Sequence, residues 1–236
     1  MEADLARKRR LQYLIIGGFA AVAVIVALIV ISQSGGDDNG GGGSPSNLRG
    51  AAQVDAELSG IPQQGQVLGD TNAPVTVVEF GDPQCPVCAA FAEQIAPELI
   101  ASEVTGGSVK YEFQPYLIIG PESEPAMTAA LAAGDQGRFW NFLQLFYRNQ
   151  GAENSGYVTD AFLMSIAEAA GIPDIDGWEQ SRNSSNWDSV LSDGTNQAES
   201  NGFQGTPSIL VQGPNGQRAL EGFGLGEIRS AIQQVS

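Results

Sequence analysis

The most hydrophobic part of the chain is an uncharged run over residues 11–31, close to the N-terminus. A helix of this length spans roughly 30 Å, the thickness of the hydrocarbon core of a bilayer. Basic residues occupy positions 7–10 before the run, and Asp37 and Asp38 follow it. The positive-inside rule then places residues 1–10 in the cytoplasm and the part of the chain after the run outside it.

A cleaved signal peptide is the alternative explanation of this run. Signal peptides carry a shorter apolar region, of roughly 7–15 residues, and a cleavage site built from small residues. This run is longer, and it ends in Ile29, Val30 and Ile31. The pattern therefore favours a retained transmembrane helix, which makes the chain a single-pass membrane protein with an extracytoplasmic C-terminal domain.

A polar, glycine-rich segment follows the apolar run. Residues 35–46 consist only of Gly, Asp, Asn, Ser and Pro. Such a composition buries too little apolar surface to offset the entropy lost on ordering. We predict a flexible linker over residues 32–60 and a folded domain over residues 61–236.

From residue 61 onward, short β-branched runs alternate with helical patterns. Residues 74–80 are continuously apolar apart from Thr76 and Glu79, as in a buried strand. The next pattern begins with Pro86, which is tolerated at the first position of a helix. Further strands are predicted over residues 108–113, 208–212 and 217–221, and helices over residues 126–133, 138–149, 159–170, 187–200 and 227–235. Without the helical block over residues 120–202, the order is β-α-β followed by β-β-α, which predicts an α/β domain.

The composition excludes several kinds of chemistry. The chain has no histidine and two cysteines, with 11 Lys and Arg against 27 Asp and Glu, a formal net charge of −16. Without histidine there can be no Ser-His-Asp or Cys-His catalytic group and no His-ligated metal. The acidic balance argues against nucleic acid as a partner, because neutralising phosphates takes clustered Lys and Arg.

Both cysteines lie in the short motif Cys85, Pro86, Val87, Cys88, between the first predicted strand and the first helix. A zinc site is disfavoured, because two further soft ligands would be needed and none exists. A purely structural disulfide is the serious alternative, although closing so short a loop removes little entropy from the unfolded chain. A redox-active pair explains the spacing, the position and the predicted compartment together.

The helical spacing gives the two sulfurs different environments. Apolar side chains recur from Cys88 onward at helical intervals, so Cys88 lies on the core-facing stripe and should be buried. Cys85 precedes the helix, at or near its N-cap, and should face solvent beside unpaired N–H groups and the positive end of the helix dipole. These groups favour the thiolate. We therefore expect Cys85 to be the nucleophile and Cys88 the resolving cysteine.

Two further positions are candidates for the site. Glu79 lies within the apolar strand, and alternation leaves open whether it faces outward or points beneath the helix as a buried acid. In the second case it could carry the proton of Cys88. Pro207 opens a predicted strand after Thr206, which is tolerated there, and a cis peptide bond is possible.

Residues 67–74, 78–88 and 205–208, with Arg138, Phe139, Trp140 and Ala198, resemble the membrane-anchored DsbA-like thiol:disulfide oxidoreductases. The resemblance implies a thioredoxin fold with an inserted helical subdomain, preceded by one N-terminal transmembrane helix. It also implies a cis Pro207 facing the disulfide, backbone pairing of Thr206 with an extended substrate, and Glu79 as the buried proton carrier. Pro86 and Val87, between the cysteines, would contact the substrate.

One position departs from the family pattern. Several members carry histidine before the second cysteine, where this chain has Val87. A histidine there helps to hold the thiolate, so we expect a milder oxidant here.

The resemblance implies an oxidase for secreted or membrane proteins, which needs no metal and no cofactor beyond the Cys85–Cys88 disulfide. A membrane oxidase of the DsbB or VKOR type would recharge it. The sequence also allows a reductase or isomerase of disulfides. A non-catalytic membrane-anchored binding or chaperone module with a structural disulfide is the third possibility.

Overall fold

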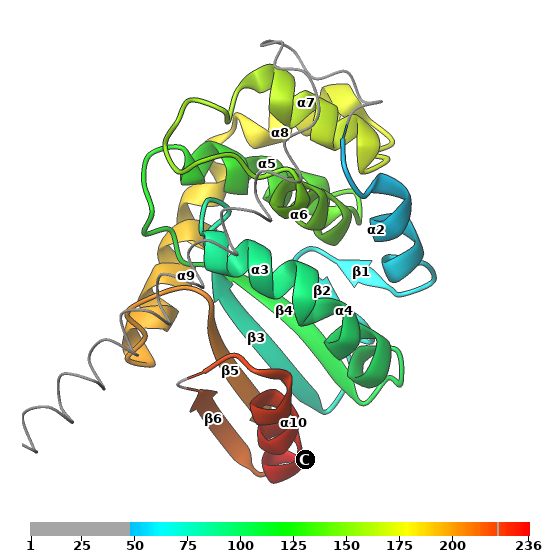
Figure 1. The fold of residues 1–236 in the computed structure, drawn as a ribbon, viewed down its shortest axis with the longest axis vertical. Coiled ribbons are helices and arrows are strands. Elements are labelled where there is room, and N and C mark those ends of the chain that lie inside the picture. Colours follow the sequence, from blue (N-terminus) through cyan, green and yellow to red (C-terminus); the bar gives the residue numbers. More distant parts are fainter. Residues whose placement is uncertain (1–47, 221) are drawn as a thin grey trace, which may run out of the picture. The chain divides into compact units, whose positions relative to one another are not determined.

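A six-stranded mixed sheet forms the centre of the computed structural model, which describes residues 48–220 and 222–236 (Figure 1). The strands are arranged in the order β1-β2-β4-β3-β5-β6. The four long strands lie within one or two residues of the predicted positions, and the short pair β1 and β2 was not predicted. The strands are β1 (Gln63–Gln64), β2 (Val67–Leu68), β3 (Val75–Gly81), β4 (Val109–Pro115), β5 (Ser208–Gly213) and β6 (Gly216–Leu220).

Strand β3 is the centre of this sheet. It pairs in parallel with β4, with Gly81 opposite Pro115 at the C-terminal end, and antiparallel with β5, with Phe80 opposite Ser208. Because parallel strands end at the same edge of a sheet, the segments that follow β3 and β4 emerge side by side. The start of β5 reaches the same edge from the other side of β3.

The two faces of the sheet are buried by different helices. Val77 and its neighbours on one face belong to the large core, together with residues of α3 (Pro86–Gln94) and α10 (Leu225–Val235). Val78 and Phe80, on the opposite face, pack with Ala198 of α9 (Asp188–Ser200) in a smaller cluster. Glu79 therefore shares a face with Val77, on the side covered by α3.

The block between β4 and β5 is helical, as predicted for residues 120–202. Thr159 caps α7, accepting a hydrogen bond from the Phe162 amide, and Gly171 and Gly202 have positive φ at the helix ends. One of its helices, α8, was not predicted, because its sequence is too polar to show a clear apolar stripe. The helices are α5 (Ser123–Gly134), α6 (Phe139–Arg148), α7 (Asp160–Ala169), α8 (Ile175–Arg182), a 3₁₀ turn (Ser185–Trp187) and α9.

The first core helix, α3, is shorter than its apolar stripe suggested. It ends at Gln94, and the chain continues as a short helix α4 (Ala96–Leu99) and a π-helical turn (Ile100–Val104). Pro97 lies within the first turn of α4 and has no amide to continue the hydrogen bonds of α3. Cys88, Phe91 and Ala92 of α3 are nevertheless buried, as predicted.

The predicted linker extends too far towards the C-terminus. Residues 51–58, expected to be flexible, form helix α2 (Ala51–Leu58), which buries Val54 and Leu58. Glu57 of α2 forms an ion pair with Arg148 at the end of α6, with an O–N distance of 2.7 Å. The folded part therefore begins before residue 61. The predicted transmembrane helix 11–31, the cytoplasmic segment 1–10 and the linker up to residue 47 lie outside the described residues.

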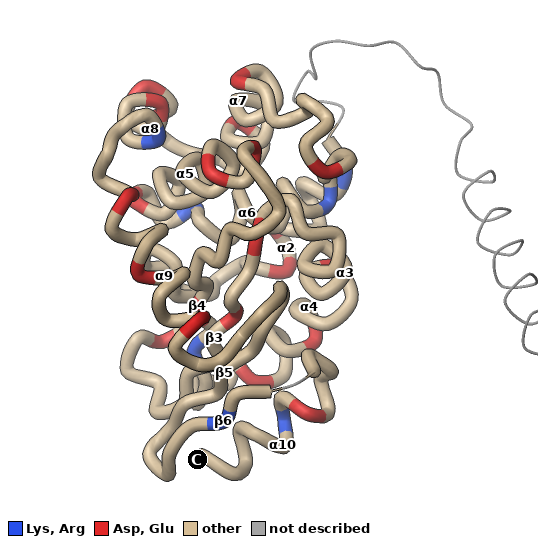
Figure 2. The backbone as a smooth tube through the Cα atoms, turned by 90° about the vertical axis from the view of Figure 1, so that its left-hand side faces the viewer, with Lys and Arg blue, Asp and Glu red and all other residues tan. Residues whose placement is uncertain are grey.

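None of the helices between residues 48 and 236, residue 221 aside, combines the length and the hydrophobicity that a bilayer crossing requires. Acidic positions greatly outnumber basic ones along the same part of the backbone (Figure 2).

We predict that Glu57→Gln lowers the free energy of unfolding by about 1–2 kcal/mol, because it leaves the buried Arg148 guanidinium without its counter-charge. The exposed Asp55 on the same helix supplies the matched control, and Asp55→Asn should change stability by less than about 0.5 kcal/mol. Urea unfolding of both variants measures the difference. Equal effects of the two substitutions would show that α2 is not held through this ion pair.

Candidate active site

The cysteine motif lies after the end of β3 and extends into the first turn of α3, where the sequence predicted it. Pro86 is the first residue of α3, and Cys85 is its N-cap with extended backbone angles (φ −71°, ψ 119°). The Cys88 amide donates a hydrogen bond to Cys85 Sγ at 3.4 Å. The sulfur thus occupies the place that an oxygen takes in an ordinary N-cap, in front of amides that have no partner within the helix.

Both sulfurs are buried, and for Cys85 this corrects the sequence-based expectation. Cys88 is fully buried, as predicted, but Cys85 exposes only 4% of its surface instead of facing solvent. The cause is the loop before β5, where the Thr206 carbonyl lies 3.3 Å from Cys85 Sγ. The Thr206–Pro207 peptide bond in this loop is cis, as the family resemblance implied. Both cysteines are free thiols.

A buried carboxylate fixes the turn in front of Cys85. Asp82 Oδ1 accepts a hydrogen bond from the Gln84 amide at 2.9 Å. Asp82 Oδ2 accepts from the amides of Ile118 and Ile119, at 2.8 and 2.9 Å, in the loop after β4. Asp82 thereby joins the two segments that leave the parallel strands β3 and β4.

The helical block contributes side chains to the same turn. Gln150, just after α6, donates to the carbonyls of Pro83 at 2.7 Å and Cys85 at 3.1 Å. Gln84 is fully buried and exchanges hydrogen bonds with Asn154, which has a positive φ of 50°. Sequence reasoning missed these positions. Asp82 and Gln84 could have been suspected from their place beside Cys85, but Gln150 and Asn154 reach the site only through the tertiary fold.

Cys85 has the electrostatics of a reactive thiol. Its pKa is lowered from 9.0 to about 6, chiefly by a hydrogen bond from the Cys88 side chain. Burial opposes this shift, and the nearby Thr206 and the amides of Cys88 and Val87 lower the pKa further. At neutral pH the folded protein therefore holds Cys85 largely as the thiolate.

The pKa of Cys88 is shifted in the opposite direction. Burial raises its pKa well above 9.0, and the hydrogen bond that it gives to Cys85 and the nearby Glu79 raise it further. The pair therefore divides into one sulfur that ionises easily and one that stays protonated, as the helical spacing indicated.

Glu79 points beneath α3, which decides between the two orientations that the sequence left open. Its side chain is 2% exposed, and Oε2 accepts a hydrogen bond from the Tyr111 hydroxyl of β4. Oε1 is buried without a hydrogen-bond partner. Desolvation raises the pKa of Glu79 from 4.5 to about 8, against the lowering effect of Tyr111. A protonated carboxyl thus lies in the electrostatic field of Cys88, where it could take up or release a proton.

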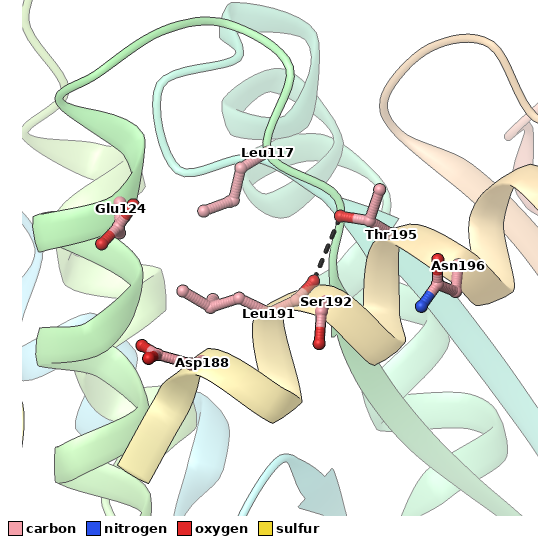
Figure 3. A pocket seen from close by; sticks show the side chains of 7 residues that line it. All are labelled: Leu117, Glu124, Asp188, Leu191, Ser192, Thr195 and Asn196. Atoms are coloured by element: carbon pink, nitrogen blue, oxygen red, sulfur yellow. Dashed lines mark hydrogen bonds between the residues drawn. The ribbon is translucent and has the colours of Figure 1, made fainter. Parts of the chain in front are cut away.

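Two pockets differ in their relation to the sulfurs. One of about 620 Å³ extends from the cis-proline loop to the end of β6. Its lining includes Thr206, Pro207, Leu220 and Phe223. The other, of about 450 Å³, lies between α5, α9 and the loop after β4, and Leu117 and Leu191 project into it (Figure 3). No thiol is among the residues that line either pocket, but the first is lined by Thr206, whose carbonyl lies 3.3 Å from Cys85 Sγ. The site for exchange chemistry is therefore the edge that holds Cys85 and the cis-proline loop.

A two-thiol motif at a helix start, opposite a cis-proline loop on a mixed sheet, defines a thioredoxin-like dithiol oxidoreductase. The Thioredoxin family model matches residues 62–225. A probable disulfide bond formation protein D of Bacillus cereus is 31% identical over 152 residues, which cover 63% of this chain and 70% of the relative.

Solved structures agree with this assignment. Oxidised BdbD of Bacillus subtilis is 25% identical with a TM-score of 0.64, covering 74% of this chain and 96% of that one. DsbA of Chlamydia trachomatis shares the fold at 22% identity and a TM-score of 0.62, covering 72% and 90% of the two chains. The chain belongs to the thioredoxin family, and it is an enzyme, a DsbA-like protein thiol:disulfide oxidoreductase.

We predict that the thiolate absorbance of the reduced protein titrates with a midpoint near pH 6, because hydrogen bonds stabilise the ionised Cys85. Cys88→Ala should move the midpoint to higher pH, since it removes the largest of these hydrogen bonds. Cys85→Ala should abolish the transition. A wild-type midpoint near pH 8.5, the value of an ordinary thiol, would contradict this account of the site.

Glu79 should make stability depend on pH in the oxidised protein, where neither thiol titrates. Burial, the largest cause of its raised pKa, does not depend on the thiols. The folded-state pKa of Glu79 therefore stays above that of an unfolded glutamate, about 4.3, and the folded protein keeps a proton that the unfolded chain loses. Stability should therefore be highest below about pH 4.3 and decline as the pH rises towards 8. Glu79→Gln should remove the decline and add roughly 2–3 kcal/mol at pH 7.

Urea unfolding across this pH range measures the slope. The half-buried Glu112 of β4 offers the matched control, because Glu112→Gln removes a carboxylate from the neighbouring strand without touching the group beneath α3. An unchanged slope in Glu79→Gln would show that Glu79 does not hold the proton.

Proposed function

We propose that this protein is a membrane-anchored, extracytoplasmic oxidase that transfers its Cys85–Cys88 disulfide to reduced secreted or membrane proteins. The observation that carries the proposal is the lowered pKa of Cys85, about 6. A stabilised thiolate favours the reduced form of the pair, which makes the disulfide more oxidising. The name of the Bacillus cereus relative, a probable disulfide bond formation protein, points in the same direction.

The reaction uses each site residue in turn. A client thiolate attacks Cys85 Sγ of the disulfide, forms a mixed disulfide and releases Cys88 as a thiolate. Glu79 supplies a proton to Cys88, whose own pKa is high. A second client thiolate then attacks the client sulfur of the mixed disulfide and releases Cys85 as a stable thiolate. The client loses two electrons and gains a disulfide, while the Cys85–Cys88 pair is reduced to the dithiol.

In the proposed reaction, the residues around Cys85 Sγ bind the client. In this proposal the backbone at Thr206, beside the cis Pro207, pairs with an extended client segment. Pro86 and Val87, which lie between the two cysteines, also contact the client. The reaction needs no metal and no cofactor besides the disulfide.

The proposed location and the proposed recharging partner are inferred from the sequence. The apolar run over residues 11–31, preceded by basic residues, supports an anchor with the catalytic domain outside the cytoplasm. Such an oxidase has to be reoxidised, and a membrane oxidase of the DsbB or VKOR type would accept the two electrons at the same membrane. The charge of −16 disfavours nucleic acid as a partner.

Equilibration of the protein with graded ratios of reduced and oxidised glutathione tests the proposal. We expect a potential clearly less negative than about −270 mV, the thioredoxin value. Val87, in the position where relatives carry histidine, should keep it below the most oxidising value of about −120 mV. A potential at or below that of thioredoxin would indicate a reductase.

A trapping experiment with cysteine variants tests the non-catalytic alternative. Cys88→Ala should accumulate mixed disulfides through Cys85, because the resolving thiol is gone, and Cys85→Ala provides the matched control, which should trap none. Failure of both cysteines to exchange would leave a binding module with a structural disulfide. Trapping through Cys88 alone would reverse the two roles.

A further inference from the structure

Two carbonyl groups of the cysteine turn are bound by one side chain from the helical block. Gln150 Nε2 donates to the Pro83 carbonyl at 2.7 Å and to the Cys85 carbonyl at 3.1 Å. The Cys85 carbonyl also accepts the first hydrogen bond of α3, from the Ala89 amide at 3.1 Å. The Gln150 amide therefore holds the peptide group before Gln84 and the peptide group after Cys85.

The orientation of the Cys85 carbonyl determines the surroundings of the sulfur. As the N-cap of α3, Cys85 has an extended ψ of 119°. The direction of its carbonyl and this angle describe the same rotation, about the bond between Cα and the carbonyl carbon. Because Cys88 lies beyond that bond, a rotation about it would move the Cys88 amide away from Cys85 Sγ, to which it donates at 3.4 Å.

The position of Gln150 is fixed from the other end of the domain. The preceding Asn149 pairs with the backbone of Arg49 in both directions, accepting from its amide at 2.9 Å and donating to its carbonyl at 3.1 Å. Arg148, one residue earlier, forms the ion pair with Glu57 of α2. Three consecutive residues at the end of α6 therefore connect the N-terminal segment around α2 to the cysteine turn.

The helical block contains a second glutamine with a comparable contact. Gln136, just after α5, donates from Nε2 to the Asp174 carbonyl at 2.8 Å and accepts from the Asp174 amide at 2.9 Å. Gln136 and Gln150 are both half-buried. Asp174 is the N-cap of α8, so this contact joins two parts of the block and does not involve the cysteine turn. Gln136 therefore offers a matched control for Gln150.

We propose that Gln150 is a positioning residue for thiol–disulfide exchange, which keeps the Cys85 backbone in the conformation that places the sulfur in front of the amides of α3. The proposal deepens the proposed function and rests on Cys85 as the reacting sulfur. When the client disulfide forms, the bond between the client sulfur and Cys85 breaks, and its electron pair stays on Cys85. Hydrogen bonds stabilise the released thiolate only in this conformation, so Gln150 makes Cys85 a better leaving group.

Gln150→Met tests the proposal in the full chain, because methionine has a similar length but no N–H donor. In the reduced variant, the thiolate absorbance should titrate about half a pH unit above the wild-type midpoint. The equilibrium with reduced and oxidised glutathione should shift about threefold towards the disulfide form, since the thiolate is less stabilised. A contact that only supported the fold would change neither measurement.

A second variant and a control complete the design. Gln150→Asn keeps the amide but is one methylene shorter, so it cannot reach both carbonyls, and it should shift both measurements in the same direction. Gln136→Met, which removes the comparable contact inside the helical block, should leave both at their wild-type values. A cooperative urea transition of each oxidised variant establishes that the compared proteins are folded.

Two outcomes overturn the proposal while leaving the proposed function intact. The first is wild-type behaviour of the folded Gln150 variants in both measurements. The second is an equal shift in Gln136→Met, which would trace the effect to a general loosening of the helical block. Failure of the wild-type Cys85 to exchange with glutathione would instead refute the proposed function.

Discussion

The constraint on which the rest of the site depends is the start of α3 at Cys85, marked by the hydrogen bond from the Cys88 amide to Cys85 Sγ. It exists because a buried strand ends four residues before the cysteine and a helix begins directly after it, with proline in the first position. Moving the helix start by one residue would turn the sulfur away from the free amides. The low pKa of Cys85, the burial of Cys88 and the place of Glu79 under α3 all follow from this one junction.

The site accommodates one negative charge readily and resists a second. Cys85 is supplied with hydrogen bonds that stabilise its thiolate, whereas burial dominates at Glu79, Cys88 and Tyr111 and raises the pKa of each. The negative charge on Cys85 itself contributes to the raised values of Glu79 and Cys88. Ionisation of Cys85 therefore helps to keep its neighbours protonated, and the reduced site holds its charge at the sulfur that faces the client.

Local sequence patterns predicted the features that depend on a few neighbouring residues. Examples are the strand before Cys85, the N-cap position of that cysteine and the burial of Cys88. The patterns failed where distant segments decide. Cys85 was expected to face solvent because the cover over it, the loop at Thr206, lies 121 residues further along the chain. Helix α2 was assigned to the linker because its partner Arg148 is 91 residues away, and Glu79 could be oriented only once Tyr111 and α3 were in place.

The hydrogen bonds around Asp82 and Gln84 have a mechanical consequence. The turn that presents Cys85 forms hydrogen bonds with Gln150, Asn154, Ser123 and the amides of the loop after β4. The helical block cannot swing away as a rigid lid without pulling apart the turn that holds the nucleophile. Opening of the sulfur to a visiting chain is therefore easier from the proline-bearing loop on the other flank, which contacts Cys85 Sγ through the Thr206 carbonyl.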